Sequence, residues 1–183
     1  TIADDDTAGI TVSAISGNTT EAGGTATFTV VLTSQPTASV SVGISSSDLT
    51  EGTVSTASLS FTTMNWSTPQ TVTVTGVNDD LDDGDIAYSI VTAAATSADS
   101  GYNGMNPSDV AVTNVDNDAV GISVTPSGDE TSEAGDAVTV SVVLTSQPSA
   151  SVTLAYTTNN SGEGVASPAS LTFTTMNWNT PKT

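Results

Sequence analysis

The segment TATFTVVLTSQP, residues 25–36, decides the fold class because apolar and hydroxyl side chains alternate along its first part. Ala26, Phe28, Val30 and Leu32 share one face of an extended chain, which is the period-2 pattern of a half-buried β-strand. The polar residues and the proline that follow are typical of a turn. The segment therefore predicts a strand that buries one face and ends near residue 32.

The same alternation recurs along the chain and predicts an all-β fold. Turns rich in Gly, Pro, Asn and Asp separate the alternating segments, and no stretch has a helical period. About seven short strands in a unit of about 110 residues fit an antiparallel β-sandwich of immunoglobulin type. The other predicted strands lie near residues 10–12, 38–44, 59–61, 72–74, 86–90 and 110–112.

Several motifs recur at a constant offset of 112 residues, which indicates tandem repeats. The motif VLTSQP occurs at residues 31–36 and 143–148, and FTTMNW occurs at residues 61–66 and 173–178. The offset also matches Asp4-Asp5-Asp6 with Asp116-Asn117-Asp118. We therefore expect tandem sandwiches, in which residues 1–7 are the tail of a preceding repeat, residues 8–118 form a complete repeat, and residues 119–183 form the N-terminal part of a second, truncated repeat.

The composition excludes several classes of chemistry. The 183 residues include 20 Asp and Glu, one basic residue (Lys182), and no His or Cys. This leaves no Ser-His or Cys-His relay, no thiol nucleophile and no thiolate zinc site. A formal net charge of −19 opposes binding to nucleic acids and to anionic membranes. We expect no enzyme, because a carboxylate pair of the glycosidase kind is the main catalytic option left and nothing in the sequence indicates a cleft.

The acidic residues are expected to gather at one end of the complete repeat. If each strand reverses its predecessor, the loops that follow every second strand lie at the same end of the sandwich. Clustered carboxylates repel one another unless a cation neutralises them, and calcium accepts about six to eight oxygen ligands in irregular geometry. Solvated acidic turns are the alternative interpretation. The residues predicted at this end are Glu21, Asp48, Glu51, Asp79, Asp80, Asp82, Asp83, Asp85, Asp116 and Asp118.

The repeat resembles the Calx-β repeat, a calcium-binding sandwich of sodium–calcium exchangers and large bacterial surface proteins. The resemblance covers the first repeat and the front of the second. It lies in Glu21 before the second strand, Asp79-Asp80 and Asp83 ahead of Tyr88, and the closing Asp116-Asn117-Asp118. Two positions depart from the family pattern: Ile86 replaces an acidic residue, and the Asp between the third and fourth strands has no clean match. Glu51 is favoured for that last position because it recurs as Glu163.

The resemblance and the acidic run together give a set of candidate calcium ligands. The resemblance implies Glu21, Asp79, Asp80, Asp83, Asp116 and Asp118, with Glu51 in the position that lacks a clean match. Asp85 belongs to the same acidic run and is kept as a candidate. The predicted metal ligands are therefore Glu21, Glu51, Asp79, Asp80, Asp83, Asp85, Asp116 and Asp118.

The resulting expectation is a structural repeat module of an extracellular stalk, adhesin or filament at a bacterial cell surface. Its partners would be neighbouring repeats of the same chain and other copies in a filament, with no membrane insertion. Asp118 runs into Ala119 without a linker, so calcium at this end would stiffen the junction between repeats. One alternative is a module that binds carbohydrate or protein, for which Tyr102 and its long loop offer an aromatic. Another is a fibre subunit that a neighbouring chain completes by strand exchange.

Overall fold

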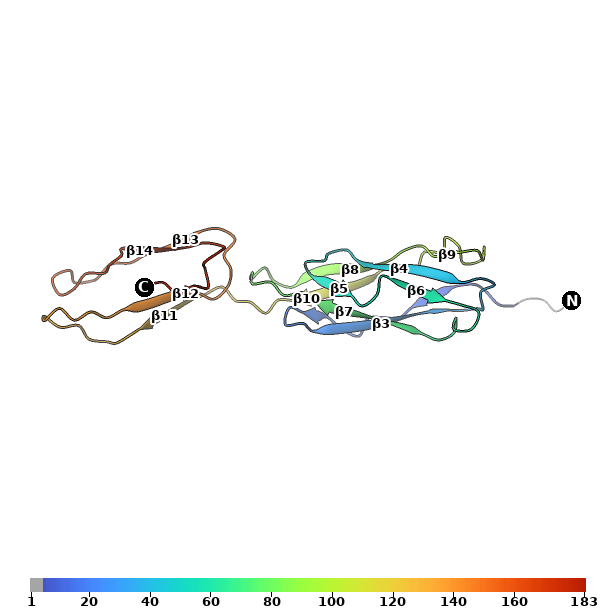
Figure 1. Cartoon of the computed structure of the whole chain (residues 1–183), viewed down its shortest axis with the longest axis horizontal. Helices are drawn as coiled ribbons and strands as arrows, with labels where there is room; N and C mark the ends of the chain where they lie inside the picture. Colours follow the sequence, from blue (N-terminus) through green and yellow to red (C-terminus); the bar gives the residue numbers. More distant parts are fainter. Residues whose placement is uncertain (1–4) are drawn as a thin grey trace. The chain divides into compact units, whose positions relative to one another are not determined.

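The computed structural model describes residues 5–183, so Asp4 and the first part of the predicted tail lie outside the described residues. The described part of the chain is all-β, with several antiparallel sheets, which confirms the predicted class and is consistent with a β-sandwich (Figure 1). Within that part, no helix has the length and apolar character needed to cross a membrane. The chain divides into two compact units: the first ends at Asn117, and the second contains Asp118–Thr183 together with Asp80–Asp82.

One sheet of the first unit has the strand order β1-β3-β7-β5, and all of its neighbours are antiparallel. Strand β3 is the strand predicted from the alternating segment, and residues on its apolar face are buried along its whole length. Strand β5 is short and was not predicted. The strands are β1 (Ile10–Val12), β3 (Thr25–Leu32), β5 (Gly52–Val54) and β7 (Gln70–Gly76).

The other sheet of the first unit has the order β2-β10-β8-β4-β6, and β9 pairs with β4 beside it. Its pairings are antiparallel except for β2 and β10, which run in parallel. Strands β2 and β9 have two residues each and were not predicted. The strands are β2 (Thr19–Thr20), β4 (Val40–Ser46), β6 (Ser58–Phe61), β8 (Ile86–Thr92), β9 (Thr96–Ser97) and β10 (Val110–Val115).

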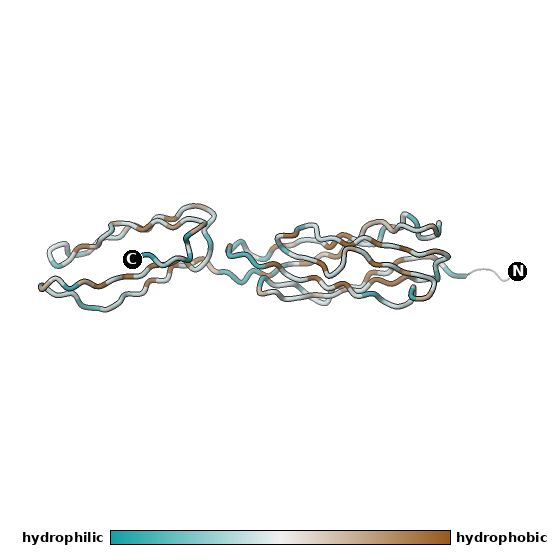
Figure 2. The backbone as a smooth tube through the Cα atoms, in the orientation of Figure 1, coloured by the Kyte–Doolittle hydropathy of each residue, from teal (hydrophilic) through white to brown (hydrophobic). Residues whose placement is uncertain are grey.

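The core of the first unit is made by alternate residues of both sheets. Val30 and Val72 from one sheet and Val42 and Phe61 from the other are fully buried. Figure 2 shows hydrophobic stretches along these strands and hydrophilic loops beyond their ends. Since one face of each strand is buried, a slip of one residue would turn the apolar set toward water, so the alternation fixes the strand register.

The second unit contains two pairs of antiparallel strands and a smaller core. Val140 is 41 % exposed, whereas Phe28, its counterpart at the repeat offset, is 1 % exposed. Strand β12 also forms an isolated bridge between Val142 and Lys182. The strands are β11 (Ile122–Pro126), β12 (Val140–Leu144), β13 (Val152–Ala155) and β14 (Ser170–Phe173), and the core residues are Val142, Leu144, Leu171 and Phe173.

Candidate metal centre

The strand ends of the first unit deliver acidic loops to one end of the unit. Strand β4 runs into the turn that carries Glu51, β7 leads to the loop of residues 77–85, and β10 ends at Val115, directly before Asp116. Strands β2 and β10 pair in parallel with Val115 opposite Thr20. The pairing extends beyond these strands, because the N–H of Glu21 donates to the Val115 carbonyl at 3.1 Å. This pairing brings Glu21 close to Asp116.

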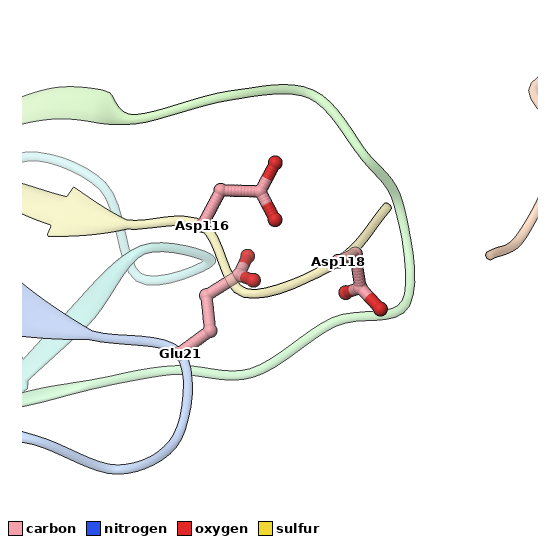
Figure 3. A group of neighbouring side chains, drawn as sticks. All are labelled: Glu21, Asp116 and Asp118. Atoms are coloured by element: carbon pink, nitrogen blue, oxygen red, sulfur yellow. The ribbon is translucent and has the colours of Figure 1, made fainter. Parts of the chain in front are cut away.

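The first carboxylate group, here the Glu21 group, consists of Glu21, Asp116 and Asp118. One ligand oxygen from each residue lies within 4.8 Å of the others. In Figure 3, Glu21 extends from the loop after β2 toward the segment that carries the two aspartates. Glu21 is only 4 % exposed, and its Oε2 accepts a hydrogen bond from the backbone N–H of Asn117 at 3.1 Å. The backbone therefore holds this carboxylate in place.

The second carboxylate group, here the Glu51 group, consists of Glu51, Asp79 and Asp83, again with ligand oxygens within 4.8 Å of one another. Glu51 is 7 % exposed. Its Oε2 accepts a hydrogen bond from the Asn114 amide, with 3.4 Å between Nδ2 and Oε2. A side chain of strand β10 thus holds this carboxylate, in contrast to the backbone N–H that holds Glu21.

Two predicted ligands belong to neither group. Asp80 is exposed. Asp85 is also exposed, and its Oδ1 accepts a hydrogen bond from the N–H of Asp116 at 3.1 Å. The neighbouring Gly84 donates its N–H to Asp116 Oδ2 at 2.7 Å, at a backbone φ of +79° that glycine adopts without strain. Asp85 therefore helps to hold the loop of residues 77–85 against Asp116. Of the eight predicted ligands, six belong to the two carboxylate groups.

Sequence reasoning missed Asn114, which is 2 % exposed. It occupies the buried face of β10 in phase with Val110 and Val112. A polar side chain on the apolar phase of a strand is a signal that the sequence contains, because buried polar groups require hydrogen-bond partners. Asn114 has such partners in Glu51, Val77 and Thr19.

Burial raises the pKa of both glutamates above the ordinary value of 4.5. Desolvation is the largest cause for Glu21 and Glu51, and the negative charge of Asp79 raises the pKa of each further. The hydrogen bonds from Asn117 and Asn114 act in the opposite direction by favouring the charged forms. Each buried carboxylate is thus surrounded by like charge, which is unfavourable for the ionised form.

No basic side chain of this chain is available to neutralise the two groups. Lys182 is the one Lys or Arg in the sequence. Its Nζ donates to the Thr172 carbonyl and lies 5.0 Å from the centroid of the Phe173 ring, inside the second unit. Oxygen donors without a protein cation are the donor set that suits calcium, a hard cation that binds carboxylates and carbonyls. The residues present therefore fit a calcium ion in each group.

The raised pKa values predict that the calcium-free chain loses stability as the pH rises. Folded Glu21 and Glu51 bind their protons more tightly than in the unfolded chain, so their stabilising contribution is complete below pH 4.5 and is lost as the pH rises through the raised values. In chelator, the melting temperature should fall from about pH 4.5 toward neutral pH. Asp48 and Asp99, which are partly exposed, have lowered pKa values, so their contribution to stability is complete above their ordinary 3.8 and does not change over this pH range.

Melting curves recorded across this pH range, in chelator and in calcium, check the prediction. Calcium competes with the protons, so the decline should be smaller in calcium. The variant Glu51→Gln removes one of the two titrating groups, so the melting temperature of this variant in chelator should fall less as the pH rises. A melting temperature in chelator that does not change above pH 4.5 would contradict the raised values.

The expectation that Tyr102 offers an aromatic surface to a ligand is wrong. Tyr102 is 1 % exposed, and its hydroxyl donates to the Ser34 carbonyl at 2.6 Å. The backbone N–H of Ser34 in turn donates to the same hydroxyl at 3.1 Å. Tyr102 thus anchors the long loop to the turn after β3, because a buried phenol needs partners for its polar end.

The Glu51 group therefore lies within the first unit, and the Glu21 group combines Glu21 and Asp116 of that unit with Asp118, which directly follows its last residue, Asn117. The two groups have the oxygen ligands that a cation would need, and their assignment as metal ligands stays a prediction. A comparison with protein-family models and a search of curated proteins found no match to this chain.

Proposed function

We propose that the first unit is a calcium-binding structural module, a Calx-β-like repeat of immunoglobulin type that belongs to a tandem array. The observation that carries the proposal is the pair of carboxylate groups, each built around a buried glutamate. A buried carboxylate beside two others is costly unless a cation neutralises it. Since the sequence provides no cation for this purpose, an ion from solution is the counter-charge that fits.

Calcium would be held by Glu21, Asp116 and Asp118 in one group and by Glu51, Asp79 and Asp83 in the other. The ion supplies positive charge and no covalent chemistry. The residues of the Glu51 group come from two loops that are distant in sequence, and those of the Glu21 group come from two further segments. Binding would therefore fasten together loops that otherwise repel one another at this end of the unit.

We propose that this fastening stiffens an array of repeats in an extracellular stalk, adhesin or filament. The chain passes from the acidic end of the first unit into Ala119 without a Gly- or Pro-rich linker. Small-angle scattering of the whole chain should show a narrower range of conformations in calcium than in chelator. Scattering profiles that indicate equal flexibility in both conditions would contradict the stiffening role and would leave calcium binding itself untouched.

Replacing the charge of Glu51 should have opposite effects with and without calcium. In chelator, Glu51→Gln removes a buried charge beside Asp79 and Asp83 and should raise the melting temperature of the first unit by several degrees, about 1 kcal/mol. In saturating calcium, the same variant removes a ligand and should lower the melting temperature. Thermal melts of both proteins in both conditions measure this reversal of sign.

Glu163→Gln is the matched control for this experiment. Glu163 is the counterpart of Glu51 at the repeat offset, but it is exposed and belongs to neither carboxylate group. Its replacement should change the melting temperature within about 0.5 kcal/mol in either condition, as expected for an exposed site. If Glu51→Gln behaves like Glu163→Gln in calcium, Glu51 is no ligand and the proposed assignment fails.

A further inference from the structure

A chain of buried polar side chains runs from the core of the first unit to the Glu51 group. Tyr88 is 6 % exposed, Thr19 is 0 % exposed and Asn114 is 2 % exposed. The Tyr88 hydroxyl lies 3.0 Å from Thr19 Oγ1, which donates to Asn114 Oδ1 at 3.1 Å. The Asn114 amide then reaches Glu51 Oε2. These residues come from β8, β2, β10 and the turn after β4.

The hydrogen bonds that link Tyr88, Thr19, Asn114 and Glu51 all donate in the same direction, from Tyr88 toward Glu51. Asn114 Nδ2 lies 2.9 Å from the Val77 carbonyl, which can only accept, so the nitrogen of the amide faces Val77 and Glu51. The amide oxygen then faces Thr19 Oγ1 at 3.1 Å, and the Thr113 carbonyl lies 3.3 Å from the same hydroxyl, so both partners of Thr19 on this side are acceptors of its proton. Because the Thr19 hydroxyl has one proton, Tyr88 donates to Thr19. This row of hydrogen bonds therefore leads from the Tyr88 hydroxyl to the Glu51 carboxylate, and each hydrogen bond polarises the next.

The surrounding backbone leaves little room for the amide to turn. A Cβ atom on Gly76 would overlap Asn114 Oδ1 and the Thr20 carbonyl, so the backbone approaches this side chain closely. Rotation of the amide by half a turn would place its oxygen against the Val77 carbonyl and the Glu51 carboxylate. Both contacts would then be between acceptors, which is costly in a buried site.

We infer that Asn114 is a positioning residue for the Glu51 carboxylate, and that Thr19 fixes the Asn114 amide in the orientation that donates to Glu51. The inference rests on the proposed function, since it concerns the calcium affinity of the Glu51 group. It applies to that group selectively, because a backbone N–H holds Glu21. Hydrogen-bond partners behind metal ligands raise affinity by keeping the ligand in one orientation.

Calorimetric titration of the whole chain with calcium tests the inference. Asn114→Leu should weaken binding at the Glu51 group by about tenfold or more, the usual range for partners of metal ligands, and leave the Glu21 group unchanged. Thr19→Val should weaken the same group by a smaller factor, and Thr19→Ser, which keeps the hydroxyl, should restore it. Unchanged affinity at both groups in a folded Thr19→Val variant would overturn the inference.

Thr92→Val is the control for the loss of a buried hydroxyl. Thr92 is 1 % exposed and is the last residue of β8, and its hydroxyl lies 3.2 Å from the Pro107 carbonyl and 3.1 Å from the Ser108 carbonyl, both of which are possible acceptors of its proton. It should lower the melting temperature without changing either calcium affinity. If Thr92→Val weakens the Glu51 group as much as Thr19→Val does, the effect is general destabilisation and the positioning role fails.

A double-mutant cycle in chelator separates this inference from the proposed function. If Asn114 holds Glu51, Asn114→Leu should lower the melting temperature less in a chain that already carries Glu51→Gln, because the hydrogen bond to the charged acceptor is gone. Additive changes would overturn the link between the two side chains even if calcium binds. Absence of calcium binding by the unmutated chain would refute the proposed function, and the cycle would still decide the link.

Discussion

Calcium should raise the melting temperature of the first unit by about 10 °C for each occupied group. An ion present at about a hundred times its Kd stabilises the folded state by about 2.7 kcal/mol. For a unit of about 110 residues, each kcal/mol corresponds to about 4 °C. Two groups that bind independently would give about 20 °C. The expected effect is this large because calcium removes the repulsion among six carboxylates at once.

Tryptophan fluorescence allows each unit to be followed separately. The two tryptophans of the chain, Trp66 and Trp178, are both half-buried, and each packs against the core of a different unit. In a Trp178→Phe variant, Trp66 reports the first unit, and in a Trp66→Phe variant, Trp178 reports the second. The calcium shift should appear in the Trp66 signal.

Magnesium at the same concentration is the ionic control. Magnesium demands nearly octahedral geometry and loses its water reluctantly, so it should give a much smaller shift than calcium. An equal shift with both ions would indicate charge screening. A melting temperature of the first unit that is the same in calcium and in chelator would refute the calcium site and leave the acidic loops as solvated turns.

Phe61→Ala should destabilise the first unit by about 3–5 kcal/mol, which is the usual cost of removing a buried phenylalanine. Phe61 is fully buried at the end of β6, in a core cluster that both sheets of the unit contribute to. The cavity would remain in part because the core around Phe61 is close-packed by residues of both sheets and can relax only partially. Denaturant unfolding, followed through Trp66 in the Trp178→Phe background, measures the loss.

Phe173→Ala is the matched variant, since Phe173 is the counterpart of Phe61 at the repeat offset and is also fully buried. Its cluster contains only three other buried residues, so the second unit has a smaller core to lose. Phe173→Ala should abolish the cooperative transition seen by Trp178 and leave the Trp66 transition in place. Loss of both transitions from either variant would show that the two units do not unfold separately.

The class of the fold could be predicted because the strands follow a simple rule. The alternation from Ala26 to Leu32 is matched in the structure by buried residues at every second position. Strands β2 and β9 were missed because two residues are too few to show a period, and β5 was missed because the sequence Gly52-Thr53-Val54 contains a single apolar side chain. The parallel pairing of β2 with β10 could not be predicted either, because a count that reverses every strand has no place for it.

The positions of the acidic side chains could be predicted only in part. The count of strand directions placed Glu21, Glu51 and Asp116 at one end of the first unit. This count could succeed because it needs only the order of the strands and not the exact shapes of the loops. The division into two groups depends on the path of residues 77–85, which includes a turn at Gly84 with positive φ. The same loop leaves Asp80 and Asp85 outside both groups, although the sequence pattern treats them like their neighbours.

The partners of the carboxylates were harder to predict than the carboxylates themselves. Asn114 lies 63 residues from Glu51 in sequence, and their contact depends on the packing of β10 against the turn after β4. Its polar side chain on the apolar phase of a strand was the available signal. Tyr102 shows the opposite error, because an aromatic in a long loop suggested exposure and the structure buries it.

Calorimetric titration of the chelator-treated chain with calcium tests the central claim most directly. The two carboxylate groups predict saturable binding of two ions per chain, with one of the two binding events lost in Glu51→Gln and both retained in Glu163→Gln. Binding that is absent, or that is unaffected by Glu51→Gln, would contradict the claim that this end of the first unit is a calcium site.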